Sequence, residues 1–440
     1  MEDLEVEGEA DLSTNPGTVP VPRPAGLHLH RWNDRAVVGV AVAAFASGFG
    51  QFGVVAALGD VARGFGQVSH GATLADQAGL SGTALGIGLA VIRLASLGAL
   101  PLTSLADRFG RRRMLLITVG AGLVMTVVAA ASPSYWWFVA IFACGRPLLS
   151  ATNGLAQVAA AEQTASADRA KAVALIAAGY GAGAGVIAIV HSLASAAIGF
   201  RGVFVAALVP LALLPLIWRW VEEPDRFAVA AAGSEHPVPV LGAVARPFRR
   251  RLAVIVILAF AVSVITGPAN SFVFLFAQNF LHQRGIVTAA MVVGAGVAGL
   301  AGLLAGRWLA DRVGRRLTGA LAMVAVALFA TLTYTGSAPA LLAGYILGVF
   351  AASVFAPAAG TLVNELFPTS VRASVAGWSL AAGVLGAVTG LVAFGAVAGV
   401  GHRFAVAGLV TFLPAALVMA VFWLLPETRG EEPEDLWPDA

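Results

Sequence analysis

The stretch of sequence that decides the fold is Leu105-Ala106-Asp107-Arg108-Phe109-Gly110-Arg111-Arg112-Arg113, a dense and mostly cationic segment between two long apolar runs. It recurs 204 residues later, again between apolar runs, as Leu309-Ala310-Asp311-Arg312-Val313-Gly314-Arg315-Arg316. An acid, an arginine cluster and a turn glycine that are repeated at half-chain spacing predict two copies of one membrane unit.

The composition is that of a membrane protein. Of the 440 residues, 58% are hydrophobic and only 12% are charged, a balance that excludes a soluble globular protein of this size. Apolar runs of about 18 or more residues recur along the chain, and each is long enough to cross a bilayer as a helix. The single cysteine, Cys144, excludes a disulfide within the chain and a cysteine-based metal site.

We count twelve apolar spans and expect an all-α membrane protein made of two pseudo-symmetric six-helix bundles. The first span ends at Asp60, before a polar loop at 60–80. The expected segments are a disordered cytoplasmic tail at 1–34, an N-terminal bundle at 35–220, a cytoplasmic linker at 221–251, a C-terminal bundle at 252–425 and a cytoplasmic tail at 426–440.

The distribution of cations predicts the orientation in the membrane. With both termini inside, the cytoplasmic segments hold 21 of the 27 lysines and arginines, in agreement with the retention of these residues on that side. The acidic, proline-rich start of the chain has the wrong composition for a signal peptide. We therefore expect a multi-pass protein of the cytoplasmic membrane with both termini in the cytoplasm.

Further charged residues recur at nearly the same offset. Glu162 and Arg169 follow the fourth span and lie seven residues apart, and Glu365 and Arg372 follow the tenth span with the same spacing. Two glutamates that lie 204 residues apart end the sixth and twelfth spans, and these are Glu223 and Glu427. Charge at helix ends explains the signs of these residues, but it does not explain their common spacing.

With these motifs the chain resembles the major facilitator superfamily over about residues 35–430. The segments 107–112 and 311–316 are similar to the motif that the family carries after spans two and eight. The family usually has a glycine four residues before the acid, where this chain has Thr103 and Arg307. Segments 365–372 and 426–430 resemble the branch of sugar porters, organic-ion transporters and metabolite–proton symporters. The Gly-Pro signature of drug–proton antiporters is absent from 179–185.

The resemblance implies a secondary transporter with a central cavity, enclosed by spans one, four, seven and ten, about which the two halves rock. The charged loops then form a cytoplasmic gate, because ion pairs of about 0–1 kcal/mol each suit a contact that must open and close. The alternative is that these cations only set the topology. The candidate gate residues are Asp107, Arg108, Arg111, Glu162, Arg169, Glu223, Asp311, Arg312, Arg315, Glu365, Arg372 and Glu427.

Two arginines lie near the middle of the bilayer. Arg93 is about 21 Å along its helix from Asp107, and Arg146 is about 24 Å from Glu162. A buried cation costs about 2.5 kcal/mol or more in the membrane, and none of the 24 acids lies at mid-span to neutralise one. A substrate carboxylate can supply the missing charge, because guanidinium groups bind carboxylates at two points. The alternative is a structural role satisfied by helix-end carbonyls or water.

Polar stripes predict which helix faces line the cavity. In span four the spacing is i, i+4, i+7 and i+11 from Arg146, and span seven has a similar stripe that includes Asn270. Such stripes must face protein or water, so the alternative is hydrogen bonding between helices with no ligand. The candidate substrate-binding residues are Arg146, Arg93, Gln51, Asn153, Gln157, Asn270, Gln278 and Tyr345.

The mode of energy coupling is left open. Sugar porters carry a protonatable aspartate in span one, where this chain has Gln51, so proton symport through a carboxylate is disfavoured. His191 in span five is a titratable group inside a span, but it is equally consistent with a neutral hydrogen-bonding histidine near the outer end. Uniport or anion exchange is the simpler hypothesis.

We conclude that the sequence predicts a transporter of a small organic anion that works by alternating access and is not an enzyme. A transporter of a sugar or another neutral metabolite is the main alternative, and drug efflux, a membrane solute sensor and a membrane redox enzyme are further ones. The expected partners are a small-molecule substrate and the lipid bilayer, together with a coupling or exchanged ion. We expect a monomer and no cofactor, metal or nucleic acid.

Overall fold

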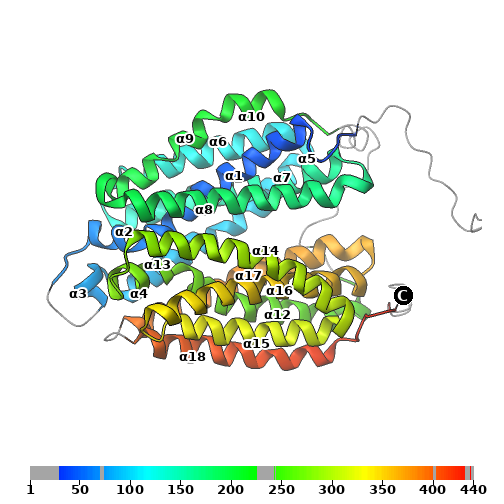
Figure 1. Cartoon of the computed structure of the whole chain (residues 1–440). Helices are drawn as coiled ribbons and strands as arrows, with labels where there is room; N and C mark the ends of the chain where they lie inside the picture. The colour runs from blue at the N-terminus through cyan, green and yellow to red at the C-terminus, as the bar shows by residue number, and fades with distance from the viewer. Residues whose placement is uncertain are drawn as a thin grey trace, which may run out of the picture.

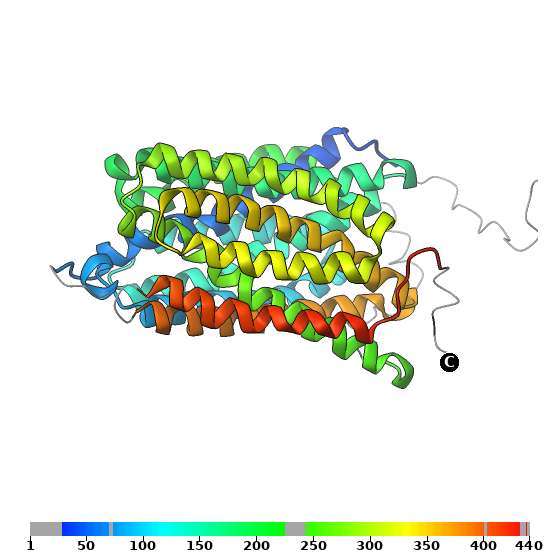
Figure 2. The same cartoon turned by 60° about the horizontal axis from the view of Figure 1, so that its bottom comes forward.

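The computed structural model describes residues 29–69, 74–224, 242, 244–399, 403–431 and 437. Long helices run side by side along one direction in both views (Figures 1 and 2). The N-terminal half, hereafter the N half, comprises α1 (Arg35–Ala56), α2 (Leu58–Phe65), α3 (Leu74–Ala78), α4 (Gly82–Ala95), η1 (Ser96–Gly98), α5 (Ala99–Phe109), α6 (Arg111–Ala129), α7 (Tyr135–Gln163), α8 (Ser166–Val205), α9 (Leu208–Ala212) and α10 (Leu214–Trp220).

The C-terminal half, hereafter the C half, repeats this arrangement. It lies below the N half in Figure 1. Its elements are η2 (Arg246–Phe248), α12 (Arg249–Ser271), α13 (Val273–Leu275), η3 (Phe276–Phe280), α14 (Gly285–Val313), α15 (Arg315–Thr333), α16 (Ala338–Leu366), α17 (Thr369–Ala398), α18 (Phe404–Ala416) and η4 (Leu417–Leu424). α12 therefore begins inside the segment 221–251 that the sequence assigns to the linker, and residues 225–241 and 243 lie outside the described part.

The described residues contain twelve membrane crossings, as the sequence predicts. Eleven helices are long and apolar enough to span a bilayer. The remaining crossing is discontinuous: α8 turns at Gly199, and the sixth span continues through the end of α8, α9 and α10. Gly199 has a φ of +64°, a conformation that glycine adopts without the steric penalty of a side chain.

The outer surface of α14 shows why the bundle needs a membrane. Val293, Val297, Leu300 and Leu304 repeat at helical spacing and are 55%, 64%, 62% and 75% exposed. An exposed apolar stripe of this length is unfavourable in water and favourable against lipid chains. The helix therefore has one face for lipid and another for protein.

The predicted tails are partly held against the bundle. His30 donates its backbone N–H to Gln163 O (2.8 Å), and its ring lies 3.2 Å from Glu222. At the other terminus Trp437 donates its indole N–H to Glu365 O (3.0 Å). Residues 1–28, 432–436 and 438–440 lie outside the described part of the chain.

We name the two ends of the molecule by their residues. The arginine-rich end is the end at which Arg111 and Arg315 begin α6 and α15, and the opposite end carries α2 and α3. At the opposite end the halves touch backbone to backbone, because a Cβ on Gly86 of α4 would lie 2.5 Å from Leu391 O of α17. At the same end, the hydroxyl of Thr288 near the start of α14 donates a hydrogen bond to Ser192 Oγ of α8 (3.0 Å). The halves are therefore closed against each other at this end.

Candidate functional site

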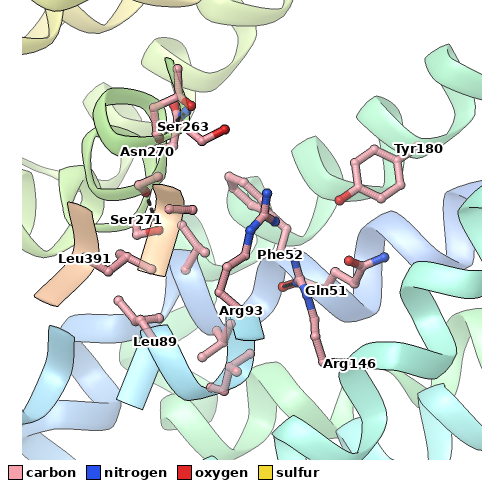
Figure 3. A pocket seen from close by; sticks show the side chains of 16 residues that line it. Gln51, Phe52, Leu89, Arg93, Arg146, Tyr180, Ser263, Asn270, Ser271 and Leu391 are labelled. Carbon is pink, nitrogen blue, oxygen red and sulfur yellow. Dashed lines mark hydrogen bonds between the residues drawn. The ribbon is translucent and has the colours of Figure 1, made fainter. Parts of the chain in front are cut away.

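A cavity of about 210 Å³ lies between the two halves (Figure 3). It receives side chains from α1, α4, α7 and α8 of the N half and from α12 and α17 of the C half. A cavity at the junction of two halves is accessible from alternate sides if the halves rock. Its polar lining comprises Gln51, Arg93, Arg146, Tyr180, Ser263, Thr266, Asn270 and Ser271.

Arg146 extends from α7 into this central cavity (Figure 3). Among the described residues it has one hydrogen-bond partner: Nη1 donates to the backbone oxygen of Gln51 over a long 3.5 Å. Its Nε is buried and has no partner among the described residues. A guanidinium carries five N–H donors, so most of its capacity is available to a ligand.

Gln51, whose backbone oxygen contacts Arg146, is held in place by a small hydrogen-bond network. Its Nε2 donates to Ser47 Oγ (2.8 Å), Ser47 Oγ donates to Leu149 O (2.7 Å), and Ser150 Oγ lies 3.4 Å from Gln51 Oε1. The bond from Ser47 to Leu149 O and the contact of Ser150 with Gln51 Oε1 join α1 to α7. The network holds Gln51 and the Arg146 turn of α7 against each other, and of the polar stripe of α7 only Arg146 lines the cavity.

Arg93 of α4 is the second cation that lines the cavity, and its side chain extends among the labelled lining residues (Figure 3). It also lines a second cavity of about 350 Å³, hereafter the α16 cavity, formed mainly by α12, α16 and α17. Its Nε is buried and unpartnered among the described residues. Neither cavity has an aspartate or glutamate in its described lining. Two cations thus share a desolvated space that contains no described acid.

The other sequence candidates are distributed as follows. Asn270 lines the central cavity. Tyr345 lines a separate cavity of about 330 Å³ inside the C half, to which Thr266 and Asn270 also contribute. Asn153, Gln157 and Gln278 are not part of the central lining; Gln157 is exposed, and Asn153 has a buried Oδ1 without a described partner.

Tyr180 of α8 is a lining residue that the sequence analysis missed. Its hydroxyl points into the central cavity, from the side opposite Asn270 (Figure 3). The residue stands in a glycine-rich run without polar neighbours at helical spacing, so the stripe criterion could not detect it. A lone aromatic residue among glycines was the only available signal.

The repeated motif of the N half folds into one ion cluster. Arg111 pairs with Asp107 (2.6 Å) and, through two nitrogens, with Glu162 (3.0 and 3.1 Å). Glu223 accepts the backbone N–H groups of Arg111 (2.5 Å) and Arg112 (3.0 Å) at the start of α6. A carboxylate at this position is favourable because it accepts free amides and interacts with the positive end of the helix.

The C half contains the same cluster. Arg315 lies 3.5 Å from Asp311 and 3.1 Å from Glu365, and Glu427 accepts the backbone N–H groups of Arg315 (2.9 Å) and Arg316 (3.2 Å) at the start of α15. The common offset in the sequence therefore corresponds to common geometry.

Four candidate gate residues lie outside these two clusters. Arg312 stacks on Trp308, with 5.1 Å from the guanidinium carbon to the ring centroid, and Arg372 donates to Phe367 O (2.8 Å). Arg108 and Arg169 form no ion pair with any described residue. Every ion pair recorded between described residues lies within one half, so the role of these charges in joining the halves stays a prediction.

His191 contacts an acid that the sequence analysis assigned to a loop. Helix α1 ends at Ala56, and a second helix, α2, begins at Leu58. This places an Asp60 carboxylate oxygen 2.8 Å from His191 Nε2. His191 is fully buried, and Asp60 is 25% exposed. Burial raises the pKa of Asp60, but the hydrogen bond and charge of His191 and the charge of Arg63 lower it, and the pKa lies below its ordinary value. The pair fixes α2 to α8 at the opposite end.

Comparisons with known proteins agree with this architecture. The model of the Major Facilitator Superfamily matches residues 40–309 and 281–438. The chain is similar to a probable 4-methylmuconolactone transporter of Cupriavidus pinatubonensis, 26% identical over 80% of this chain and 84% of that protein. It is also similar to the 3-(3-hydroxy-phenyl)propionate transporter of Escherichia coli, 27% identical over 76% of this chain and 83% of that protein.

The fold is similar to that of a solved transporter. The inward open conformation of the xylose transporter XylE from E. coli superposes with a TM-score of 0.68, at 17% identity, over 91% of this chain and 98% of that chain. The family match covers both halves, and the repeated ion clusters and the cavity between the halves lie within it. The chain therefore belongs to the Major Facilitator Superfamily, and it is a membrane transporter and not an enzyme, as the sequence predicts.

Proposed function

We propose that the protein carries a small organic anion, a carboxylate, across the cytoplasmic membrane by alternating access. The observation that supports this proposal is the pair of guanidinium groups, Arg93 and Arg146, that line the central cavity without a described acid. Removing a charge from water is costly unless a counter-charge is present. The anion supplies that counter-charge when it binds.

The remaining lining defines the rest of the substrate. Phe52, Leu89, Ile92 and Leu391 give the cavity apolar walls, while Tyr180 and Asn270 provide hydrogen-bonding groups. Apolar walls with a few polar groups favour a compact body that carries one charged group. One relative is named as a 3-(3-hydroxy-phenyl)propionate transporter and the other as a probable 4-methylmuconolactone transporter. The first of these names supports an organic acid with such a body, and both names support a compact organic substrate.

The halves are closed at the opposite end, and the α16 cavity continues from Arg93 along the first part of α12, towards the arginine-rich end. We place the arginine-rich end in the cytoplasm, because it carries most of the cations. In the other state the two ion clusters approach each other and close this end. One chain contains both halves, so a monomer suffices.

Counterflow in proteoliposomes tests this function. Vesicles loaded with unlabelled benzoate should accumulate labelled benzoate, and vesicles loaded with glucose should not accumulate labelled glucose. Arg146→Gln should raise the KM for benzoate about 10–150-fold, because a hydrogen bond to a charged group contributes about 1.5–3 kcal/mol. Arg284→Gln, at an exposed position outside both cavities, is the matched control. Glucose counterflow without carboxylate counterflow across a panel of aromatic and aliphatic acids would refute the proposal.

A further inference from the structure

A second cavity adjoins the central cavity at Arg93. Arg93 and Ser263 line both the central cavity and the α16 cavity, so the two cavities are neighbours on either side of these residues. The α16 cavity is the larger, about 350 Å³ against about 210 Å³. A ligand bound in the central cavity therefore has a second space beside its charged end.

The walls of the α16 cavity are apolar apart from Arg93 and two serines. Phe355 and Phe422 form an edge-to-face pair, with 6.2 Å between ring centroids, and Leu258, Val363 and Leu380 also contribute. Ser379 donates its hydroxyl to Val375 O (2.7 Å), so its donor is already used. The described lining therefore presents one cation at its junction with the central cavity and apolar surface elsewhere.

We propose that the α16 cavity is a substrate subsite that holds the apolar extension of a longer carboxylate, while Arg93 and Arg146 bind its carboxylate in the central cavity. The substrate class is thus an amphipathic organic acid, such as an arylalkanoate, and not only a compact anion. The inference rests on the proposed anion transport and extends it. The unpartnered Nε of Arg93 and the adjoining apolar walls give this subsite a charge pattern that an amphipathic anion complements.

Gly360 of α16 offers a way to fill this subsite alone. It lines the α16 cavity and not the central cavity, and a Cβ added there meets no atom within 4 Å. The Cβ of Gly360→Leu therefore meets open space, and the rest of the leucine side chain fills part of the α16 cavity. Gly296→Leu is the matched control, because Gly296 of α14 also has open space around its Cβ and lines neither cavity.

The experiment measures the affinity of the purified full chain for benzoate, 3-phenylpropionate and 5-phenylpentanoate. In the wild type, affinity should rise with chain length, up to about fourfold for each methylene that is fully buried. Gly360→Leu should abolish this rise while leaving benzoate affinity within about twofold, and Gly296→Leu should behave as the wild type. Retained benzoate affinity shows that the variant is folded, and Ala359→Leu, on the same cavity wall, is a second filling variant.

Two results overturn the inference, and they differ from failure of the proposed function. If the wild type binds benzoate but affinity does not rise with chain length, or if both filling variants keep the wild-type rise, the α16 cavity is not a substrate subsite. If the wild type binds none of the three acids, the proposed anion transport and the subsite are both refuted.

Discussion

Gly86 is a test of how the two halves close. It lies in α4 at the opposite end, where α4 packs against α17, and a Cβ there would stand 2.5 Å from Leu391 O. An ordinary contact of this kind is 3.4–4 Å. Gly86→Ala therefore requires the two helices to separate by about 1 Å, a displacement that overpacking of a tight contact produces. The contact joins the two halves, so the separation acts on the closed state of this end.

The magnitude follows from the cost of overpacking. Inserting a methyl group into a tight contact costs about 1–3 kcal/mol. In the proposed mechanism this cost applies only when the opposite end is closed, because opening that end would separate Gly86 from Leu391. The equilibrium should therefore shift towards the open state about 5–150-fold. Gly296→Ala, where the added Cβ meets no atom within 4 Å, should not shift it.

Spin-label distances between the halves measure this shift. Gln67→Cys and Arg284→Cys place labels on exposed residues of the two halves at the opposite end, in a Cys144→Ser background. Double electron–electron resonance should show a larger population at long distance in Gly86→Ala than in the parent. An unchanged distance distribution in Gly86→Ala would show that this glycine contact does not control closure.

Three further predictions concern single groups. Glu223→Gln should lower the free energy of unfolding by about 1–2 kcal/mol, because the start of α6 loses its charged cap, and a scan of thermal unfolding checks this. Asp60→Asn should destabilise the protein at neutral pH. Because the pKa of the Asp60 carboxyl is lower in the folded than in the unfolded protein, the difference in stability between wild type and variant should shrink as the pH falls below about 4. Equal stability differences at pH 7 and pH 3 would contradict this. Tyr180→Phe should raise the KM for a carboxylate about fivefold through the loss of one hydrogen bond, and an unchanged KM would remove Tyr180 from the binding site.

The internal repeat made the fold and the ion clusters predictable. Asp107 and Asp311 occupy equivalent positions, and the same atoms of Glu223 and Glu427 accept the first amides of the helices that follow the two motifs. The helical rise from Asp107 puts Arg93 far from the motif, and Arg93 does line the central cavity, although η1 interrupts the helix between the two residues. The periodicity of polar residues and the placement of charges are therefore sufficient to predict features that depend on regular helices and on the internal repeat.

Features that depend on broken helices were not predictable in the same way. A continuous helix would put Gln278 on nearly the same face as Asn270, but α12 ends at Ser271 and Gln278 lies within the wide turn of η3. Of the two residues, only Asn270 lines the central cavity. Wide helical turns of this type insert an extra residue and rotate the following side chains. The sequence predicted Asp60 at the start of a polar loop. In the structure the chain forms α2 after Ala57, and Asp60 pairs with His191.

The central claim is that the two cavity arginines bind a carboxylate, and isothermal titration of the purified protein tests it most directly. The wild type should bind benzoate at least about tenfold more tightly than benzamide, which has the same shape and no charge, since a charged hydrogen bond contributes about 1.5 kcal/mol or more. Arg146→Gln should remove most of this preference. Equal affinity of the wild type for benzoate and benzamide would contradict the claim.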